Sequence, residues 1–295
     1  MSVTKLLSRI APPVDVLDDD RVRPNKSLIS SLHDHTYGIT ADPLTQFACV
    51  FSALIHDVDH SGVPNTQLIK ENTELATRFG GRSVAEQNSI VLAWELLMKA
   101  EFIELRYAIC ATKSDLIRFR QLVVNAVLAT DIMDKDLKNI RNVRWKKAFA
   151  DEQKEQVDAV APHEEMLDQV NRKATIVIEH MIQASDVSHT MQHWHIYRKW
   201  NELYYFECYS AYAKGRSTMD PTDTWYQGEL DFFDFYIIPL AKKVQECGAF
   251  GVSGSEYLQY AMGNRLEWQT RGKEMVVEMK KRVQEKNLTN EQVEV

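Results

Sequence analysis

The sequence has little glycine or proline and no excess of positive charge. Its 11 glycines and 8 prolines are too few for a collagen, a flexible linker or a low-complexity chain. Lysine and arginine number 35 against 42 acidic residues, which gives a net charge of −7. This balance argues against a nucleic-acid binder, because phosphate contacts need clustered basic side chains. The 44% hydrophobic and 26% charged content is typical of a globular protein.

Long apolar runs and paired cysteines are also missing. No run reaches the roughly 18–20 apolar residues that span a bilayer, and the N-terminus lacks the apolar core of a signal peptide. The four cysteines (Cys49, Cys110, Cys208 and Cys247) form no C-x-x-C pair, which excludes a zinc ribbon or a redox motif. A reducing, cytoplasmic location is the simplest expectation.

Helical periodicity dominates the chain, and no proline falls between Pro64 and Pro162. Asp42 before Pro43 is typical of a helix start, and S-x-x-E at Ser83 and Glu86 predicts a capping box. Pro239 should kink or restart its helix. No segment alternates as a strand would, so we expect an all-α, multi-helix bundle. The expected helices are 42–56, 83–100, 114–130, 165–185, 189–214, 225–247 and 255–286.

The organisation suggests one compact helical domain over residues 42–280. Residues 1–41 should hold a short helix and then an irregular segment. Residues 141–165 are polar and mixed in charge, which predicts an exposed insertion. Residues 281–295 should form a polar tail at the end of the last helix.

The strongest chemical signal is HDVDH, from His56 to His60, at the end of an apolar helix. Imidazoles bind transition metals, whereas carboxylates suit harder cations or bridge two metals. Adjacent His56 and Asp57 can face one cation only if the helix ends there, and Gly62 and Pro64 favour such an end. The motif therefore predicts metal ligands presented from a helix terminus.

Two aspartates break apolar runs further along the chain: Asp131 in VLATDIM and Asp186 in MIQASDVSH. A buried carboxylate is costly unless it is paired or bound to a metal. Asp186 alone could simply cap a helix end. Together with HDVDH, it becomes the expected distant metal ligand.

These residues resemble the class I 3′,5′-cyclic-nucleotide phosphodiesterase catalytic domain, part of the HD superfamily. The resemblance covers about residues 44–275 and rests on HDVDHSGVPN (56–65), SVAEQ (83–87), LATD (128–131), ASDVSH (184–189), YRKW (197–200) and FFDFYIIPLA (232–241). It implies an all-α bundle around a pocket with two divalent metal ions, Zn²⁺ plus Mg²⁺ or Mn²⁺. The implied reaction, part of signal transduction, uses a metal-activated hydroxide to hydrolyse cAMP and/or cGMP to the 5′-monophosphate.

The resemblance also assigns roles, motif by motif. The implied metal ligands are His56, Asp57 and Asp186, with Asp57 as the bridge between the two ions. The residues implied to orient metal-bound waters are His60, Glu86 and Thr130. The implied substrate-binding residues are Phe232, which stacks on the purine, Glu229, His189 and Asn65, which also supports the loop after the metal motif.

The chain departs from the family at the start of the pocket. The family has an HN-x-x-H segment whose first histidine protonates the leaving 3′-oxygen and whose second binds metal. No such segment precedes His56, where only His33 and His35 occur, spaced H-x-H. MSVTKLLSRI resembles the helix that follows this segment in the family. We therefore expect a chain truncated just downstream of it, with substitution by His33 or His35 as the alternative.

Two of the implied substrate-binding positions also differ from the family. Glu229 stands where the family commonly has glutamine, and His189 stands where adenine-selective members carry asparagine. An ionised carboxylate only accepts hydrogen bonds, whereas an amide both donates and accepts. The preference between cAMP and cGMP therefore stays open.

Two other functions remain open beside the phosphodiesterase. The chain could be a weakened or inactive nucleotide-binding module, or an HD-type hydrolase of another phosphoester; Phe232 and its helix favour a cyclic nucleotide over the latter. The expected partner is a cyclic nucleotide, with no nucleic acid and no direct membrane segment. Fusion to sensor or cyclase modules in a longer, membrane-anchored parent is a further expectation.

Overall fold

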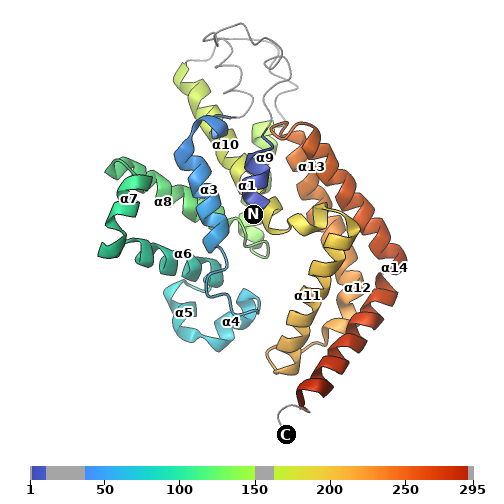
Figure 1. Ribbon diagram of the computed structural model, residues 1–295. Helices are drawn as coiled ribbons and strands as arrows, with labels where there is room; N and C mark the ends of the chain where they lie inside the picture. The colour runs from blue at the N-terminus through green and yellow to red at the C-terminus, as the bar shows by residue number, and fades with distance from the viewer. Residues whose placement is uncertain (1, 11–36, 150–162, 292–295) are drawn as a thin grey trace.

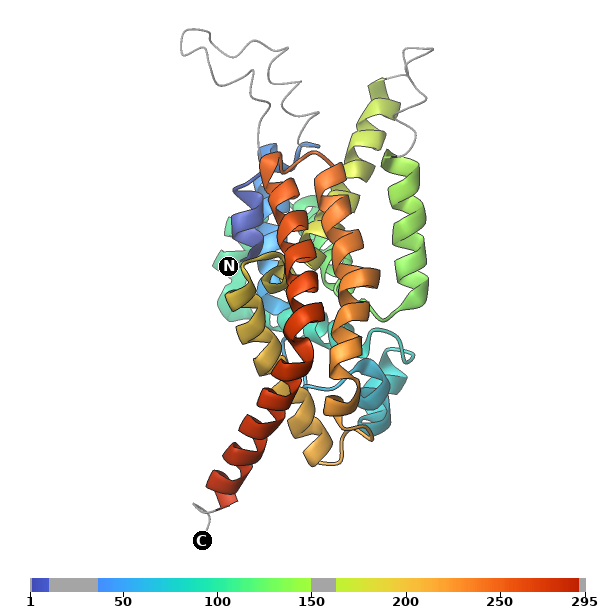
Figure 2. The ribbon, with the colours of Figure 1, turned by 90° about the vertical axis from the view of Figure 1, so that its right-hand side faces the viewer.

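A computed structural model describes residues 2–10, 37–149 and 163–291, and every regular element in these ranges is helical. Helix α10 runs through the middle, with α3 to α8 on one side and α11 to α14 on the other (Figure 1). Helices α13 and α14 run side by side along one face (Figure 2). The α-helices are α1 (Ser2–Leu7), α3 (Pro43–Ile55), α4 (Asn65–Glu71), α5 (Thr73–Arg78), α6 (Val84–Leu97), α7 (Ile103–Ile109), α8 (Lys113–Leu128), α9 (Lys135–Phe149), α10 (His163–Asp186), α11 (Trp194–Ala213), α12 (Pro221–Phe232), α13 (Ile238–Glu246) and α14 (Val252–Glu291). The shorter elements are η2 (Ile39–Ala41), η3 (Ala100–Phe102), η5 (Ser188–Met191) and the π-helical turn η6 (Phe233–Ile237). The prediction of an all-α bundle is confirmed.

Helix α3 forms for the local reasons that its sequence suggests. The Asp42 carboxylate accepts hydrogen bonds from the backbone N–H groups of Leu44 and Thr45, and Pro43 occupies the first turn. Residues Ala48, Cys49, Ser52 and Ile55 recur every three or four positions and are buried. The helix packs along α8 and ends at Ile55, as the metal motif requires.

Helix α8 presents an apolar stripe to the core. Phe119, Val123 and Val127 are fully buried and pack against α3 and α6. Its N-terminus carries the capping box, in which Thr112 and Asp115 exchange side-chain and backbone hydrogen bonds.

Pro239 restarts its helix, as predicted. It has no backbone N–H, and the turn before it widens so that the N–H of Ile238 donates to the carbonyl of Phe233, five residues back. The π-helical turn directly follows Phe232, the expected purine-stacking residue.

Among the described residues, the buried apolar side chains form three clusters. The largest lies among α1, α10, η5 and α11 to α14 and includes the fully buried Tyr197, Tyr205 and Trp268. A second joins α3, α6 and α8. The smallest, Val63, Leu68, Val84 and Ala85, lies directly beyond the metal motif and ties α4 to α6.

Several expected boundaries are corrected. Ser83 does not form a capping box with Glu86; it has left-handed backbone geometry, and its hydroxyl donates to Asp131 instead. The helix expected over 189–214 begins only at Trp194, after a 3₁₀ turn. Of its aromatic residues, Tyr197 and Tyr205 are buried, whereas Trp200 and Tyr204 are exposed.

The expected insertion at 141–165 is also corrected in part. Residues 141–149 complete α9, where Arg141 and Trp145 are buried, because the Trp145 ring packs on Phe149 and His180. Residues 150–162 lie outside the described structure, as do residues 11–36 of the expected irregular segment. At the other end α14 continues past residue 280, and Val283 is still buried in the core.

The cysteines and the lengths of the apolar helices agree with the sequence. All four cysteines are free, with Cys49, Cys110 and Cys247 buried as small apolar side chains. Within the described ranges, no helix combines the length and the apolar character needed to cross a bilayer.

Candidate active site

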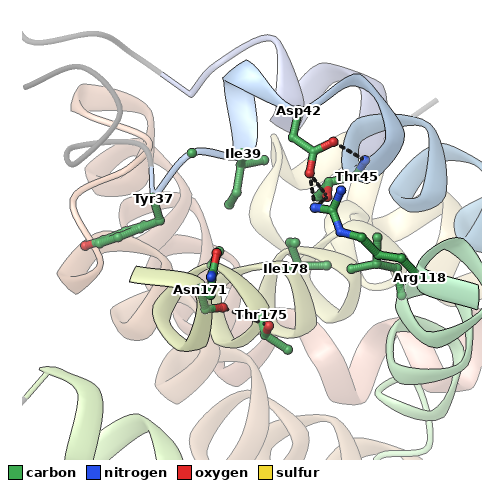
Figure 3. Close-up of a pocket in the computed structure, with 11 residues that line it drawn as sticks. Tyr37, Ile39, Asp42, Thr45, Arg118, Asn171, Thr175 and Ile178 are labelled. Atoms are coloured by element: carbon green, nitrogen blue, oxygen red, sulfur yellow. Dashed lines mark hydrogen bonds and ion pairs between the residues drawn. The ribbon is translucent and has the colours of Figure 1, made fainter. Parts of the chain in front are cut away.

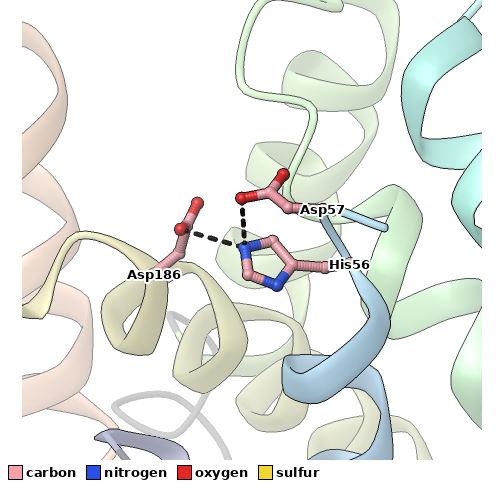
Figure 4. A group of neighbouring side chains, drawn as sticks. All are labelled: His56, Asp57 and Asp186. Atoms are coloured by element: carbon pink, nitrogen blue, oxygen red, sulfur yellow. Dashed lines mark hydrogen bonds and ion pairs between the residues drawn. The ribbon is translucent and has the colours of Figure 1, made fainter. Parts of the chain in front are cut away.

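His56, Asp57 and Asp186 come together at the junction of α3 and α10 (Figure 4). Nε2 of His56 lies 3.1 Å from Asp57 Oδ2 and 3.3 Å from Asp186 Oδ1. One ligand atom from each residue lies within 4.8 Å of the others. One imidazole nitrogen and two carboxylate oxygens are a donor set that suits a divalent cation.

The His56 side chain is oriented by its own helix. Its Nδ1 lies 3.1 Å from the carbonyl oxygen of Ala53, so Nδ1 carries the hydrogen and Nε2 faces the two carboxylates. Burial opposes protonation of the ring, but the hydrogen bonds and charges of Asp186 and Asp57 raise the His56 pKa to about 10. The contact with His56 in turn lowers the pKa of Asp57. The two carboxylates therefore place negative charge beside Nε2 of His56, where a cation could bind.

Asp186 differs from its expected environment. The sequence suggests a buried carboxylate after an apolar helix, whereas 35% of the Asp186 side chain is exposed. The apolar residues of α10 end at Ala184, and Asp186 is the last residue of the helix, where its side chain clears the core. The cluster therefore opens toward solvent and could receive a ligand.

Helix α6 holds the loop that carries the metal motif. The Ser89 hydroxyl donates to the carbonyl of Val58 at 2.7 Å, and the Asn88 amide donates to Asp59 Oδ2 at 3.1 Å. Asp59 has a left-handed backbone (φ 62°), a conformation that asparagine and aspartate tolerate better than most residues. Sequence reasoning missed both Asn88 and Ser89, although Ser89 follows Glu86 by one helical turn and therefore shares its face of α6.

A network of polar side chains joins α4, α6 and the segment after α8. Asn65 Nδ2 donates to Glu86 Oε2 at 2.9 Å and approaches Asp131 Oδ2 at 3.4 Å, while Asn65 Oδ1 accepts from the N–H of Ala85. The Ser83 hydroxyl donates to Asp131 at 2.7 Å. Asn65 thus bridges three elements with both of its amide hydrogens engaged.

Glu86 lies between this network and the metal motif. Burial raises its pKa, and the nearby Asp131 charge adds to the effect, while Asn65 and His60 oppose it. His60 accepts the N–H of Gly62 through Nδ1, which leaves the hydrogen on Nε2. Thr130 donates its hydroxyl to the carbonyl of Val127, one turn back in its own chain.

A second group of candidate residues lies on α11 and α12. The Tyr197 hydroxyl is 2.5 Å from Glu229 Oε2, and Asn201 Nδ2 is 3.3 Å from the same hydroxyl. Burial raises the pKa of Glu229 to about 7, although Tyr197 and Asn201 favour the ionised form. The sequence identified Glu229, but the Tyr197 hydroxyl as its partner was missed.

Phe232 and His189 are two further residues that the sequence predicts to bind substrate. The Phe232 ring stacks on Tyr236, with ring centroids 5.4 Å apart and planes 22° apart. Burial raises the Tyr236 pKa, and the Asp186 charge raises it further. The His189 ring lies parallel to Tyr197 at 6.3 Å, and burial lowers the His189 pKa to about 4.

Arg216, just after α11, ties the end of that helix to the loop that follows HDVDH and to α4. Its guanidinium donates to the carbonyl of Ser61 at 2.7 Å and to both carboxylate oxygens of Glu71 at 2.6 and 3.0 Å. A bidentate pair fixes orientation as well as distance. No sequence pattern indicates this residue, because its partners are far away along the chain.

Two cavities lie elsewhere in the described structure. One, of about 320 Å³, is bounded by η2, α3, α8 and α10, and the Asp42–Arg118 ion pair closes one side of it (Figure 3). The other, of about 310 Å³, lies among α1, the end of α10, η5 and α14. Neither is lined by His56, Asp57 or Asp186.

Comparisons with known proteins agree on one family. Residues 26–249 match the 3′5′-cyclic nucleotide phosphodiesterase family. The probable 3′,5′-cyclic-AMP phosphodiesterase pde-4 of Caenorhabditis elegans is 30% identical over 159 residues, which cover 54% of this chain and 22% of that protein. The dual specificity calcium/calmodulin-dependent 3′,5′-cyclic nucleotide phosphodiesterase 1B of Bos taurus is 26% identical over 200 residues, which cover 65% of this chain and 33% of that protein. The chain thus spans about a fifth to a third of the length of these relatives.

A solved structure has the same fold. The phosphodiesterase domain of the Salpingoeca rosetta rhodopsin phosphodiesterase superposes with a TM-score of 0.61 at 16% identity, covering 96% of this chain and 82% of that one. The family match extends over well more than half of the sequence and includes HDVDH, Asp186 and Phe232. The chain therefore belongs to the 3′5′-cyclic nucleotide phosphodiesterase family.

Proposed function

We propose that this protein hydrolyses 3′,5′-cyclic nucleotides, cAMP and/or cGMP, to the 5′-monophosphates. The observation that carries the proposal is the cluster of His56, Asp57 and Asp186, formed by a family motif and an aspartate 130 residues away. In the reaction, water adds to phosphorus, the bond from phosphorus to O3′ breaks, and O3′ takes a proton.

The cluster would hold the divalent cation that the family uses. His56 offers Nε2, since Nδ1 is committed to a carbonyl, and Asp57 has two oxygens with which to bridge a pair of ions. Zn²⁺ with Mg²⁺ or Mn²⁺ is the proposed pair. Such ions neutralise charge on phosphoryl oxygens and lower the pKa of water.

The surrounding residues would position water and substrate. Asn65 holds the Glu86 carboxylate in place, and Glu86, His60 and Thr130 orient water at the cations. Phe232 stacks on the purine, and Glu229 and His189 shape the rest of the base site. Asn65 acts on the substrate only through the groups that it positions, because its amide hydrogens are already engaged.

The proton for O3′ distinguishes hydrolysis from simple binding. The family's HN-x-x-H segment is missing from the sequence, and His33 and His35 lie outside the described residues. A nucleotide-binding module with weak or no turnover is the second candidate function. Loss of a general acid typically costs a factor of about 10²–10⁴ in rate.

The setting of the protein is also a proposal. The solved relative is one domain of a rhodopsin phosphodiesterase. We propose a cytoplasmic domain that functions beside sensor or cyclase modules in a longer parent.

Hydrolysis and metal content of the purified chain test the proposal. The chain is loaded with Zn²⁺ and Mg²⁺ or Mn²⁺, bound metal is counted by mass spectrometry, and cAMP and cGMP turnover is followed by chromatography. Asp186→Asn should lose metal and lower turnover by at least about 100-fold, since even indirect disruption of ligands costs 10–100-fold. Asp223→Asn, an exposed aspartate on α12, is the matched control and should change neither.

Three results would change the conclusion. Metal and nucleotide binding without turnover would establish the binding module. Turnover of another phosphoester but not of cAMP or cGMP would point to a different phosphohydrolase. If Asp186→Asn kept its metal and its activity, the proposed site would be wrong.

A further inference from the structure

Helix α9 carries a concentration of positive charge in a chain that is acidic overall. Its 15 residues include six lysines and arginines and one acidic residue, Asp136, so the helix has a local charge of +5. The whole chain has a charge of −7. The helix, drawn in green at the right of Figure 2, runs along one edge of the molecule. The proposed hydrolysis uses none of its side chains.

The side of α9 that packs on the bundle uses the two arginines and an aromatic ring. Arg141 is 7% exposed and donates to the carbonyl of Asp131 at 3.1 Å. Arg144 pairs with Glu179 of α10 at 2.8 Å, and Trp145 is buried. Because these three residues of α9 are fixed against the rest of the structure, they determine which side of the helix faces solvent.

The opposite side of α9 combines exposed lysines with exposed apolar side chains. Lys135 and Lys146 are both exposed and lie on one stripe of the helix, because eleven residues make about three turns. Ile140, Val143 and Lys147 are spaced by three and four residues and form the adjoining stripe. Ile140 is 54% exposed and Val143 is 66% exposed. We call these five residues the α9 outer face.

The charge of the α9 outer face is not neutralised within the described ranges. Asp136, the acidic residue of the helix, pairs instead with Arg82 at 3.5 Å. Among the described residues, Lys135, Lys146 and Lys147 have no acidic partner. The face therefore presents three positive charges around an apolar centre, and an anionic surface is its electrostatic complement.

We propose that the α9 outer face docks on an anionic phospholipid bilayer, with the lysines on lipid headgroups and Ile140 and Val143 at the edge of the acyl chains. Basic residues clustered on a helix are typical of binding to acidic lipids. Lysine suits a fluid surface, because its ammonium group is a point charge on a flexible apolar stem. A fixed carboxylate on a protein is better matched by the planar fork of arginine, and both arginines of α9 are engaged with the bundle.

Flotation of the full chain with lipid vesicles tests the proposal without any measurement of turnover. Vesicles of phosphatidylcholine alone are compared with vesicles that also hold about 30% phosphatidylserine, in about 0.1 M and about 0.5 M salt. The chain should bind the anionic vesicles in low salt. Its affinity should be at least about tenfold lower in high salt and on neutral vesicles, because both changes weaken the attraction of the lysines.

A triple variant, Lys135→Gln with Lys146→Gln and Lys147→Gln, removes the charge of the α9 outer face. Its affinity for the anionic vesicles should fall about 100-fold, because each lysine near such a surface contributes on the order of fivefold. The matched control loses the same charge elsewhere and should fall by less than about threefold. Its substitutions to glutamine are at three exposed lysines, Lys99, Lys113 and Lys214. Circular dichroism and thermal unfolding check that both variants fold.

The apolar side chains of the α9 outer face provide a second measurement. The double variant Ile140→Gln with Val143→Gln keeps the lysines and the helix. Its affinity for the anionic vesicles should fall roughly tenfold at either salt concentration, because less apolar surface leaves water. Poly-glutamate and a short DNA duplex, which have no apolar layer, should bind more weakly than the vesicles and should not distinguish this variant from the unmodified protein.

The outcomes distinguish a lipid surface from other occupants of the face. No binding to anionic vesicles, equal binding to neutral ones, or unchanged binding by the triple lysine variant would overturn the inference. A soluble polyanion bound as tightly as the vesicles would identify an acidic protein or a nucleic acid as the partner instead. Self-association without lipid, abolished in the triple lysine variant, would show that a second copy of the chain covers the face.

Discussion

His180 shows at the residue scale how burial controls a charge. It is 3% exposed, its Nδ1 donates to the carbonyl of Ile176 at 2.7 Å, and its Nε2 lies 3.2 Å from Lys243 Nζ. Burial, and then the Lys243 charge, lower its pKa to about 3. The folded protein therefore keeps this histidine neutral.

A pH dependence of stability follows. Between pH 6.5, the ordinary histidine value, and about 3, the unfolded chain binds a proton at His180 that the folded chain does not. The contribution of His180 to the free energy of unfolding should fall, as pH decreases through this window, by roughly 1.4 kcal/mol per unit. Urea unfolding at a series of pH values measures it.

The variant His180→Phe keeps an aromatic ring beside Trp145 and removes the titration. The slope of its unfolding free energy against pH should be smaller than that of the unmodified protein, by the equivalent of about one proton. His195→Phe, at an exposed position, should keep the original slope. Equal slopes for His180→Phe and the unmodified protein would show that His180 is not responsible.

At this scale, the sequence predicts chemistry better than environment. HDVDH and Asp186 could be identified because a metal site needs those residue types together, and the structure places His56, Asp57 and Asp186 within ligand distance. Local capping rules misassigned Ser83, because its partner Asp131 is 48 residues away. The Tyr197 contact with Glu229 was missed for the same reason.

Close packing of α12 against α14 depends at the element scale on a glycine. A Cβ atom at Gly272 would lie 2.9 Å from both Trp268 Cε2 and Tyr226 Cδ2. Trp268 is fully buried and donates its indole N–H to the carbonyl of Tyr226, so it has no free direction in which to move. The two helices therefore require a residue without a side chain.

The substitution Gly272→Ala should lower the free energy of unfolding by about 1–3 kcal/mol, as overpacking does. Gly263→Ala on the same helix meets no atom within 4 Å and should raise it by about 0.5–1 kcal/mol, the helix propensity of alanine. Chemical denaturation of both variants measures the difference. A stabilising Gly272→Ala would contradict the packing argument.

Helix positions were largely predictable, because buried residues of α3 and α8 repeat with the helical period. The ends of the helices, and whether a polar segment is a helix or a loop, could not be predicted. The 3₁₀ turn before Trp194 and the π-helical form of the turn before Pro239 follow from none of the local sequence signals described above. The start of the expected insertion at 141–165 belongs to α9, since Trp145 is buried against His180, a contact formed only in the folded chain.

Stability is distributed unevenly at the scale of the whole molecule. Helices α5 and α7 contain no buried residue, whereas α13 buries Leu240, Ala241 and Val244 in the main cluster. Segments with few buried contacts open at low free-energy cost. The buried apolar contact of α4 with its surroundings is a cluster of four small to medium side chains, Val63, Leu68, Val84 and Ala85.

Hydrogen exchange should reveal this order. We expect amides of α5 and α7 to exchange well before those of α13 and of residues 176–184 of α10. A divalent cation at the proposed site should slow exchange in residues 56–62, and Asp186→Asn should abolish that effect. Uniform protection, or cation protection that persists in Asp186→Asn, would count against the assignment.

The contact between His56 and Asp186 has a consequence for how the molecule folds. It joins residues 130 apart, and Arg216 joins Ser61 across 155. Closing such long loops is costly in entropy, so these contacts form only after the intervening helices are in place. Before α10 is in place a cation would find only the adjacent pair His56 and Asp57, so the complete site would act after the folding barrier has been crossed. A bound cation should therefore slow unfolding and leave the rate of folding unchanged.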